Sequence, residues 1–118
     1  SHPLVNSPQK HGNIPTIDAL GERFDSKLEE KEYRKLQARE HMGAIRNLRR
    51  RVKFSLFLAH GEHLQTYTAD FCFLELQGGE WRFVVADAKS RHTRLLPTWS
   101  KICKLMLACH NISIRVLP

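Results

Sequence analysis

The segment QTYTADFCFLELQGGEWRFVVADAK, residues 65 to 89, carries the pattern that decides the fold. Both of its halves are rich in aromatic and apolar residues, and Gly78 and Gly79 stand between them. Because glycine adopts the positive φ angles of a tight turn, the segment predicts an antiparallel β-hairpin. Each half also contains one aspartate next to apolar residues, Asp70 and Asp87. A turn at the two glycines places these acids opposite each other to within one register step.

The sequence on either side of this hairpin predicts further elements. Before it, residues 52 to 58 alternate apolar and polar as a half-buried strand requires, and residues 26 to 42 have a helical period with a serine cap and a glycine stop. After it, residues 97 to 111 predict a second amphipathic helix and residues 112 to 117 a short strand. The predicted order is α-β-β-β-α-β, which is an α/β (α+β) fold with a mixed sheet flanked by helices.

The length and composition of the chain are those of one soluble domain. It has 118 residues and a formal net charge of +7, which favours a polyanionic partner. Residues 1 to 15 are rich in Pro, Ser, Gly and Asn and predict a flexible leader, so the domain spans residues 16 to 118. No membrane span and no secretion signal is predicted. Three cysteines without CxxC spacing indicate reduced thiols in a cytoplasm.

The paired acids and a nearby lysine form a candidate catalytic site. Asp87 and Lys89 lie two residues apart on one strand, so their side chains share a face. If Asp70 and Asp87 are adjacent, their repulsion implies a bound cation or a proton between them. Two carboxylates, a backbone carbonyl such as that of Ala88, and several waters suit Mg²⁺. The set indicates phosphodiester hydrolysis, although Asp87 and Lys89 alone are more simply explained as a salt bridge.

Four motifs in this order, FDSKLEEKEY, KFSLF, YTADF and VVADAKSR, resemble the PD-(D/E)XK nuclease superfamily and, within it, a group of small phage and prophage nucleases. The resemblance covers about residues 12 to 117. It implies a restriction-endonuclease-like core and Mg²⁺-dependent cleavage of DNA, with Mn²⁺ able to substitute. Ala69 stands where the superfamily has proline, a departure that removes no ligand. Carried over by position, the catalytic and metal-binding residues are Glu29, Asp70, Asp87 and Lys89.

Glu29 has a second interpretation. Ser26 and Glu29 have the spacing of a capping box, in which the glutamate turns back to the amide of Ser26 and has only a structural role. We expect the metal-binding or water-positioning role. Glu30 and Glu32 are alternative acidic partners, because the argument fixes a helix face rather than one position.

Basic residues lie on both sides of the proposed site in the sequence. Such groups can neutralise phosphates and position a duplex without reading its sequence. The candidates for DNA contact are Arg46, Arg49, Arg50, Arg51, Lys53, Arg91, Arg94 and Lys101. Trp81 and Trp99 are expected in the core or an interface, and Cys109 in the core. His60 and His63 are better explained as a solvated loop than as zinc ligands.

The sequence therefore predicts a Mg²⁺-dependent endonuclease that cuts branched DNA, similar to a Holliday-junction resolvase, in phage DNA recombination or processing. Symmetric cutting of a junction requires a two-fold homodimer. The expected location is the cytoplasm of a bacterial host, without membrane contact or a small-molecule cofactor. Two alternatives are a nicking or non-specific phage DNA endonuclease and a catalytically inactive DNA-binding subunit. The latter is less favoured because a binding module gains nothing from two acids that repel phosphate.

Overall fold

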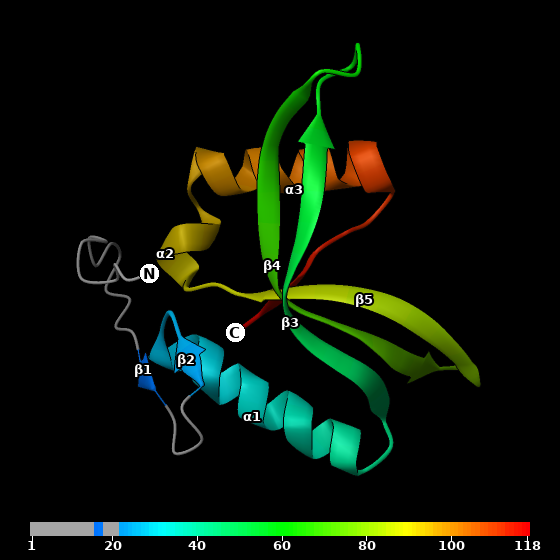
Figure 1. Ribbon diagram of the computed structural model, residues 1–118. Coiled ribbons are helices and arrows are strands. Elements are labelled where there is room, and N and C mark those ends of the chain that lie inside the picture. The colour runs from blue at the N-terminus through cyan, green and yellow to red at the C-terminus, as the bar shows by residue number, and fades with distance from the viewer. Residues whose placement is uncertain (1–15, 18–21) are drawn as a thin grey trace.

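The structure, a computed structural model, describes residues 16–17 and 22–118, so the predicted leader lies outside the described residues. Two short strands, β1 (Thr16–Ile17) and β2 (Arg23–Phe24), pair ahead of helix α1 (Lys27–His41). The main elements follow in the order β3 (Ile45–Phe57), β4 (His63–Gln77), β5 (Glu80–Ala88), α2 (Arg91–Arg94), α3 (Pro97–His110) and β6 (Arg115–Leu117). The predicted α-β-β-β-α-β order is thus present as α1, β3, β4, β5, α3 and β6 (Figure 1).

The sheet is mixed, as predicted, with the strand order β3-β4-β5-β6. Strands β3, β4 and β5 form an antiparallel meander, and β6 returns parallel to β5. The β4–β5 hairpin turns at Gly78 and Gly79, which have φ angles of 57° and 84°. Its register runs from Gln77 opposite Glu80 to Phe71 opposite Ala86. The next step of this register is Asp70 opposite Asp87, so the predicted juxtaposition of the two acids is confirmed.

Each helix packs on its own part of the sheet. Helix α1 contributes Leu36 to a core cluster with Phe71, Phe73, Val84 and Ala86 of β4 and β5. Helix α3 contributes Trp99 and Met106 to a second cluster, whose sheet residues are Leu56, Tyr67, Ala69, Cys72 and Val85. The alternation of Cys72 with Phe71 and Phe73 between the clusters is that of a sheet covered on both faces. Two small cores therefore hold one sheet between α1 and α3.

The β3–β4 hairpin bends sharply between these two cores. Ala69 and Phe71 are two residues apart on β4, yet they pack in different clusters, whereas a regular strand keeps such residues on one face. Opposite them on β3, Arg51 has a left-handed φ of 55°, a conformation that L-residues rarely adopt. In Figure 1 the hairpin changes direction between a part that rises beside α3 and a part that lies over α1. We call the rising part, residues 52–57 and 63–69, the hairpin arm.

Several boundaries differ from the sequence prediction. Strand β3 begins at Ile45 rather than at residue 52, because arginines and the left-handed residues Asn47 and Arg51 hide its alternation. The pair β1–β2 and the short helix α2 were not predicted, and the last strand is limited to Arg115–Leu117. Cys72, Cys103 and Cys109 are free thiols, as expected. Within the described ranges, every helix is too short or too polar to span a lipid bilayer.

Candidate active site

Asp70 and Asp87 lie next to each other just beyond the last ladder pair of β4 and β5. The backbone amide of Asp70 donates a hydrogen bond to Oδ1 of Asp87 at 2.6 Å. In return, the amide of Ala88 donates to Oδ2 of Asp70 at 2.9 Å. Each carboxylate thus takes a backbone donor from the other strand, beyond the last regular ladder pair. This exchange fixes the two acids side by side at the end of the hairpin.

Asp87 is deeply buried, with only 1% of its surface exposed. The hydroxyl of Tyr67 donates to its Oδ2 at 2.6 Å, and Nζ of Lys89 lies 3.6 Å from the same oxygen. The Lys89 amine also lies 4.9 Å from the centre of the Trp99 ring, and Trp99 packs against Tyr67. A phenol and an indole thereby hold the acid and the amine in fixed positions.

Both acids carry their charge at a high electrostatic cost. Burial, the carboxylate of Asp87 and that of Glu29 together raise the pKa of Asp70 to about 8. Burial also raises the pKa of Asp87, against the opposing effects of Lys89, the Tyr67 hydroxyl and the Asp70 amide. Burial raises the pKa of Tyr67 as well, and the nearby Asp87 charge adds to this, so Tyr67 stays a neutral donor. Such mutual repulsion is relieved by a proton or a cation between the acids.

Glu29 lies at the start of α1 and combines a capping role with an unsatisfied atom. Ser26 Oγ accepts from the Glu29 amide at 3.0 Å, and Glu29 Oε1 accepts from the amide of Asp25, not of Ser26, at 2.8 Å. Glu29 Oε2 is buried without a hydrogen bond and lies 3.5 Å from Nη2 of Arg50. Burial raises the pKa of Glu29. The serine cap is therefore present, but the predicted bond from the Ser26 amide is replaced by one from the Asp25 amide. The metal-binding role of Glu29 stays a prediction.

The two alternative acids on α1 have other neighbours. Glu32 is buried and pairs with Lys35 at 3.0 Å, and Glu30 lies 3.7 Å from Arg34. Neither appears among the charges that raise the pKa of Asp70, whereas Glu29 does. Glu29 is thus the acid of α1 that the structure associates with the pair.

Arg50 does not have the position expected of a DNA contact. Its side chain is only 14% exposed and lies 4.0 Å from the centre of the Phe24 ring. It donates to Oε2 of Glu22 at 2.9 Å and to the carbonyl of Arg23 at 2.6 Å. The guanidinium therefore anchors β2 to β3, and we correct its assignment from a DNA contact to an internal ion pair.

The other predicted basic contacts lie on β3, α2 and α3. Arg49, Arg51 and Lys53 are exposed on β3, and Arg91, Arg94 and Lys101 are exposed on α2 and α3. Arg46 lies 4.1 Å above the Trp81 ring, at the opposite end of β5 from Asp87. The structure thus leaves Arg46 remote from the site.

The donor chemistry of this group suits a divalent cation. Among the residues that the structure describes, no three His, Cys, Asp or Glu side chains converge closely enough to hold a metal ion as they stand. The expected coordination uses two carboxylates, a carbonyl and water, which is a set that Mg²⁺ accepts. The raised pKa of Asp70 and the buried, unbonded Oε2 of Glu29 are the features that a cation would satisfy. These are the residues that would hold the metal that the sequence resemblance implies, and the metal itself stays a prediction.

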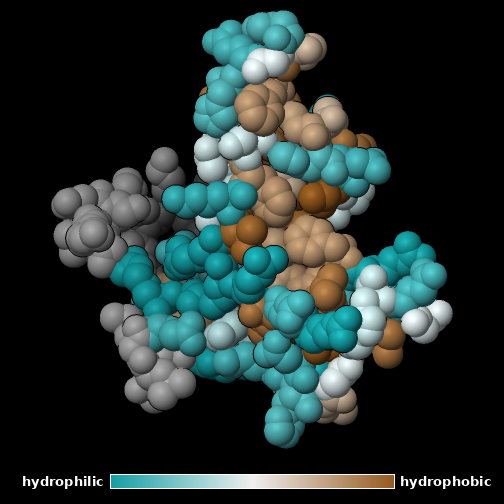
Figure 2. All heavy atoms as spheres, turned by 45° about the vertical axis from the view of Figure 1, so that its right-hand side comes forward, coloured by the Kyte–Doolittle hydropathy of each residue, from teal (hydrophilic) through white to brown (hydrophobic). Residues whose placement is uncertain are grey.

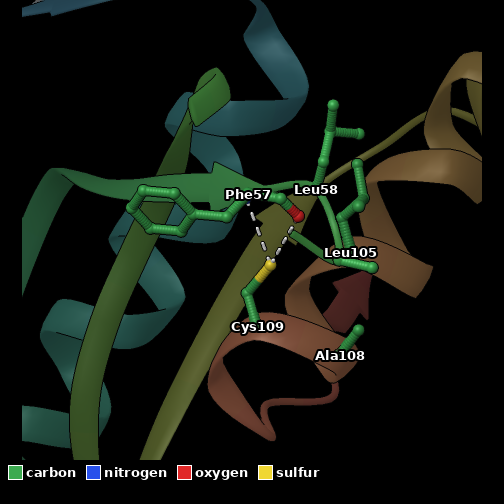
Figure 3. A pocket seen from close by; sticks show the side chains of 6 residues that line it. Phe57, Leu58, Leu105, Ala108 and Cys109 are labelled. Carbon is green, nitrogen blue, oxygen red and sulfur yellow. Dashed lines mark hydrogen bonds between the residues drawn. The ribbon is translucent and has the colours of Figure 1, made fainter. Parts of the chain in front are cut away.

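An apolar pocket lies elsewhere, between the tip of the arm and the end of α3. It has a volume of about 490 Å³ and is lined by Phe57, Leu58, Ala59, Leu105, Ala108 and Cys109. Figure 3 shows the thiol of Cys109 turned toward the backbone of Phe57, and its Sγ lies 3.3 Å from the Phe57 amide and 3.4 Å from its carbonyl oxygen. The pocket contains no carboxylate or amine, so it is not part of the candidate site.

Tyr67 and Trp99 are the site residues that sequence reasoning missed. Trp99 was expected in the core or an interface, and Tyr67 was not singled out. The spacing of Tyr67 from Asp70 gives no sign of contact with Asp87, because that contact depends on the bend of β4. One signal was available in the sequence. A tyrosine at a core-facing strand position usually needs a hydrogen-bond partner for its hydroxyl.

Compared with known proteins, the chain matches no protein-family model, no curated protein and no solved structure.

Proposed function

We propose that this protein is a divalent-metal-dependent endonuclease that hydrolyses phosphodiester bonds in DNA. The observation that carries the proposal is the pairing of Asp70 with Asp87 beside Lys89, with Glu29 close enough for its charge to act on Asp70. A purely structural pair of acids would be disfavoured at this position, since burial and repulsion both destabilise it.

Each residue has a distinct task in the proposed reaction. Asp70 and Asp87, with the carbonyl of Ala88 and an acid from α1, would hold Mg²⁺. When bound, the ion supplies polarisation of the phosphoryl oxygen and lowers the pKa of a water ligand. Lys89 places a positive charge beside Asp87, where it offsets charge that develops on the phosphate. Tyr67 and Trp99 hold Asp87 and Lys89 in place.

The architecture agrees with what the sequence resemblance implies. The two acids lie on neighbouring antiparallel strands, and Lys89 follows the second of them. A helix that contains Glu29 comes before them, and a basic helix comes after them. The order of elements is the one expected for a restriction-endonuclease-like core. These agreements support the proposal without depending on any one short motif.

A direct test is incubation of the protein with linear, nicked, flap and four-way-junction DNA, with Mg²⁺, with Mn²⁺ and with EDTA. We expect cleavage with either metal and none with EDTA. Cleavage that persists in EDTA, or the absence of cleavage on every substrate, would contradict the proposal. The second outcome together with firm DNA binding would favour the inactive DNA-binding subunit.

The finer part of the proposal is a preference for branched DNA and action as a homodimer in phage DNA recombination. Four-way junctions cut faster than linear duplex would support it, and equal rates would favour a nicking or non-specific endonuclease. For the dimer, the exposed apolar side chains Leu76 and Phe83 lie on one face of the sheet and are the interface residues to test. Figure 2 shows an apolar band below the hydrophilic tip of the arm. Sedimentation of the wild type and of a Phe83→Ser variant measures the association.

A further inference from the structure

The hairpin arm has one covered face and one open face. The covered face packs against α3 through Val52, Phe54, Leu56, Tyr67 and Ala69. The residues between them on each strand point the other way and are exposed. Lys53 lies opposite Thr68, and Ser55 lies opposite Thr66. The open face thus presents one amine and three hydroxyls in a compact array.

One end of this array lies near the acidic residues of the candidate site. Arg51 precedes Lys53 at the bend, where its guanidinium donates to the carbonyl of Arg23 at 3.3 Å and lies 3.5 Å from Asp25. The Arg51 charge also acts on Glu29, whose pKa it lowers. Arg51 therefore links the end of the open face next to Lys53 with Asp25 and Glu29 at the start of α1. A chain lying along the open face would arrive at this end of the site.

We propose that the open face of the hairpin arm binds the sugar-phosphate backbone of DNA and guides it to Asp70 and Asp87. This inference rests on the proposed function. Amines and hydroxyls are the groups that contact phosphate oxygens in protein–DNA complexes. The array contains no carboxylate, and the chain has a net charge of +7, so the charges are complementary to a polyanion. Its contacts go to the backbone, so they carry no sequence preference.

Two variants separate the amine from the hydroxyls. Lys53→Gln removes one cation, and the double variant Thr66→Val and Thr68→Val removes two hydroxyls while keeping β-branched side chains suited to a strand. Of these hydroxyls, that of Thr66 lies 3.4 Å from Nε2 of His63. Matched controls are Lys104→Gln on α3 and Ser113→Ala before β6, both at exposed positions that are not part of the open face. Circular dichroism checks that each variant is folded.

The measurement is fluorescence anisotropy of a labelled DNA duplex in EDTA, over a series of salt concentrations, so that cleavage does not interfere. We expect Lys53→Gln to weaken binding about fivefold and to reduce the slope of log K against log salt by about 0.9. The threonine double variant should weaken binding about tenfold and leave the slope unchanged. The two controls should bind as the wild type does.

The outcomes distinguish this inference from the proposed function. If the wild type binds and cleaves DNA and both arm variants bind with wild-type affinity, the inference is wrong and the proposed function stands. If the wild type neither binds nor cleaves DNA, the proposed function is wrong and the inference falls with it. Loss of affinity in the control variants equal to that in the arm variants would also overturn it, because a specific face would then not be involved.

Discussion

Strand β4 carries two acidic groups five residues apart, half-buried Asp70 and buried Glu75, whose pKa values are shifted in opposite directions. Glu75 accepts hydrogen bonds from Arg39 of α1, from both terminal nitrogens of Arg115 in β6 and from Gln77. These donors lower its pKa to about 2, whereas the pKa of Asp70 is raised to about 8. Burial is the largest cause of the raised pKa of Asp70, and the carboxylates of Asp87 and Glu29 add to it. At Glu75 the hydrogen bonds from Arg115, Arg39 and Gln77 outweigh the effect of burial.

The contrast teaches how to distinguish a structural acid from a functional one. Glu75 joins a helix and two strands, and its charge is fully compensated by the protein itself. Asp70 faces Asp87 and the charge of Glu29, and only Lys89 and a backbone amide oppose this. Among the described residues, the causes that raise the pKa of Asp70 therefore outweigh those that lower it. This imbalance is the reason why we propose a cation at Asp70.

The largest expected effect is the loss of cleavage in the Asp70→Asn variant. An asparagine keeps an oxygen for the Ala88 amide but removes the negative charge, so we expect the cleavage rate to fall roughly a thousandfold or more. The free energy of unfolding should not fall. Glu75→Gln is the matched control on the same strand, and its cleavage rate in folded protein should stay near that of the wild type. A folded Asp70→Asn protein that cleaves at the wild-type rate would contradict the assignment.

The same variant tests the linkage to pH. Asp70 is protonated in the folded protein up to a pKa of about 8, against an ordinary value of 3.8. Between these values the folded state binds the proton more tightly, so the stability of the metal-free protein should decline as pH rises through this window. Asp70→Asn should flatten the decline, and Mg²⁺ should raise the melting temperature of the wild type near pH 8 but not that of the variant. Thermal unfolding across this pH range measures both effects.

The next effect in size is that of Lys89→Ala. Because its amine lies beside Asp87 and against Trp99, we expect the cleavage rate to fall roughly a hundredfold with little change in DNA affinity. Single-turnover kinetics and binding in EDTA separate the two quantities. A loss of affinity as large as the loss of rate would reassign Lys89 to the phosphate-contact residues.

The Glu75→Gln variant should lower the stability of the protein rather than its cleavage rate. Its side chain is 11% exposed, and losing the charge weakens its bonds to Arg39 and Arg115, so we expect a loss of about 2 kcal/mol in the free energy of unfolding. The contribution of Glu75 is present above its ordinary pKa of 4.5 and is lost as pH falls toward 2. Urea unfolding at several pH values should therefore show the wild type converging on the variant in acid. Parallel curves would show that the ion pairs contribute nothing.

The smallest effect is expected from Tyr67→Phe. Removing the hydroxyl leaves Oδ2 of buried Asp87 without its 2.6 Å hydrogen bond, so we expect about a tenfold lower cleavage rate. The pKa of Asp87 should also rise further, because the Tyr67 hydroxyl lowers it. The ascending limb of the pH–rate profile should then move to higher pH. An unchanged profile would show that Tyr67 serves only the core.

Much of this site could be predicted from sequence because it depends on local geometry. The two glycines fix the turn, the turn fixes the register, and the register brings Asp70 to Asp87. Lys89 follows from the two-residue period of a strand. These steps need only short-range backbone rules.

What could not be predicted depends on the bend at Arg51. A regular strand would keep Arg50 and Val52 on one face, but the structure turns Arg50 toward Phe24 and Val52 toward the α3 core. Arg50 therefore became an internal ion-pairing residue, and Tyr67 came to face Asp87. A left-handed arginine has no distinctive sequence signal, unlike a glycine in the same conformation. The sequence alone therefore could not show which side chains of β3 and β4 face the core beyond the bend.

The parallel return of β6 has a consequence for the order of folding. Val116 pairs beside Asp87, although the β4–β5 hairpin that carries both acids closes through a turn of only a few residues. Strand β6 can pair with β5 only after the segment that contains α3 has crossed the sheet. Closing this long segment costs conformational entropy before the β5–β6 contacts form. We therefore expect the two acids to meet early, in a hairpin still open to water, and to be buried only when β6 docks. Pulsed hydrogen exchange during refolding should show protection of the Phe73 amide before that of Lys89, which bonds to Leu117.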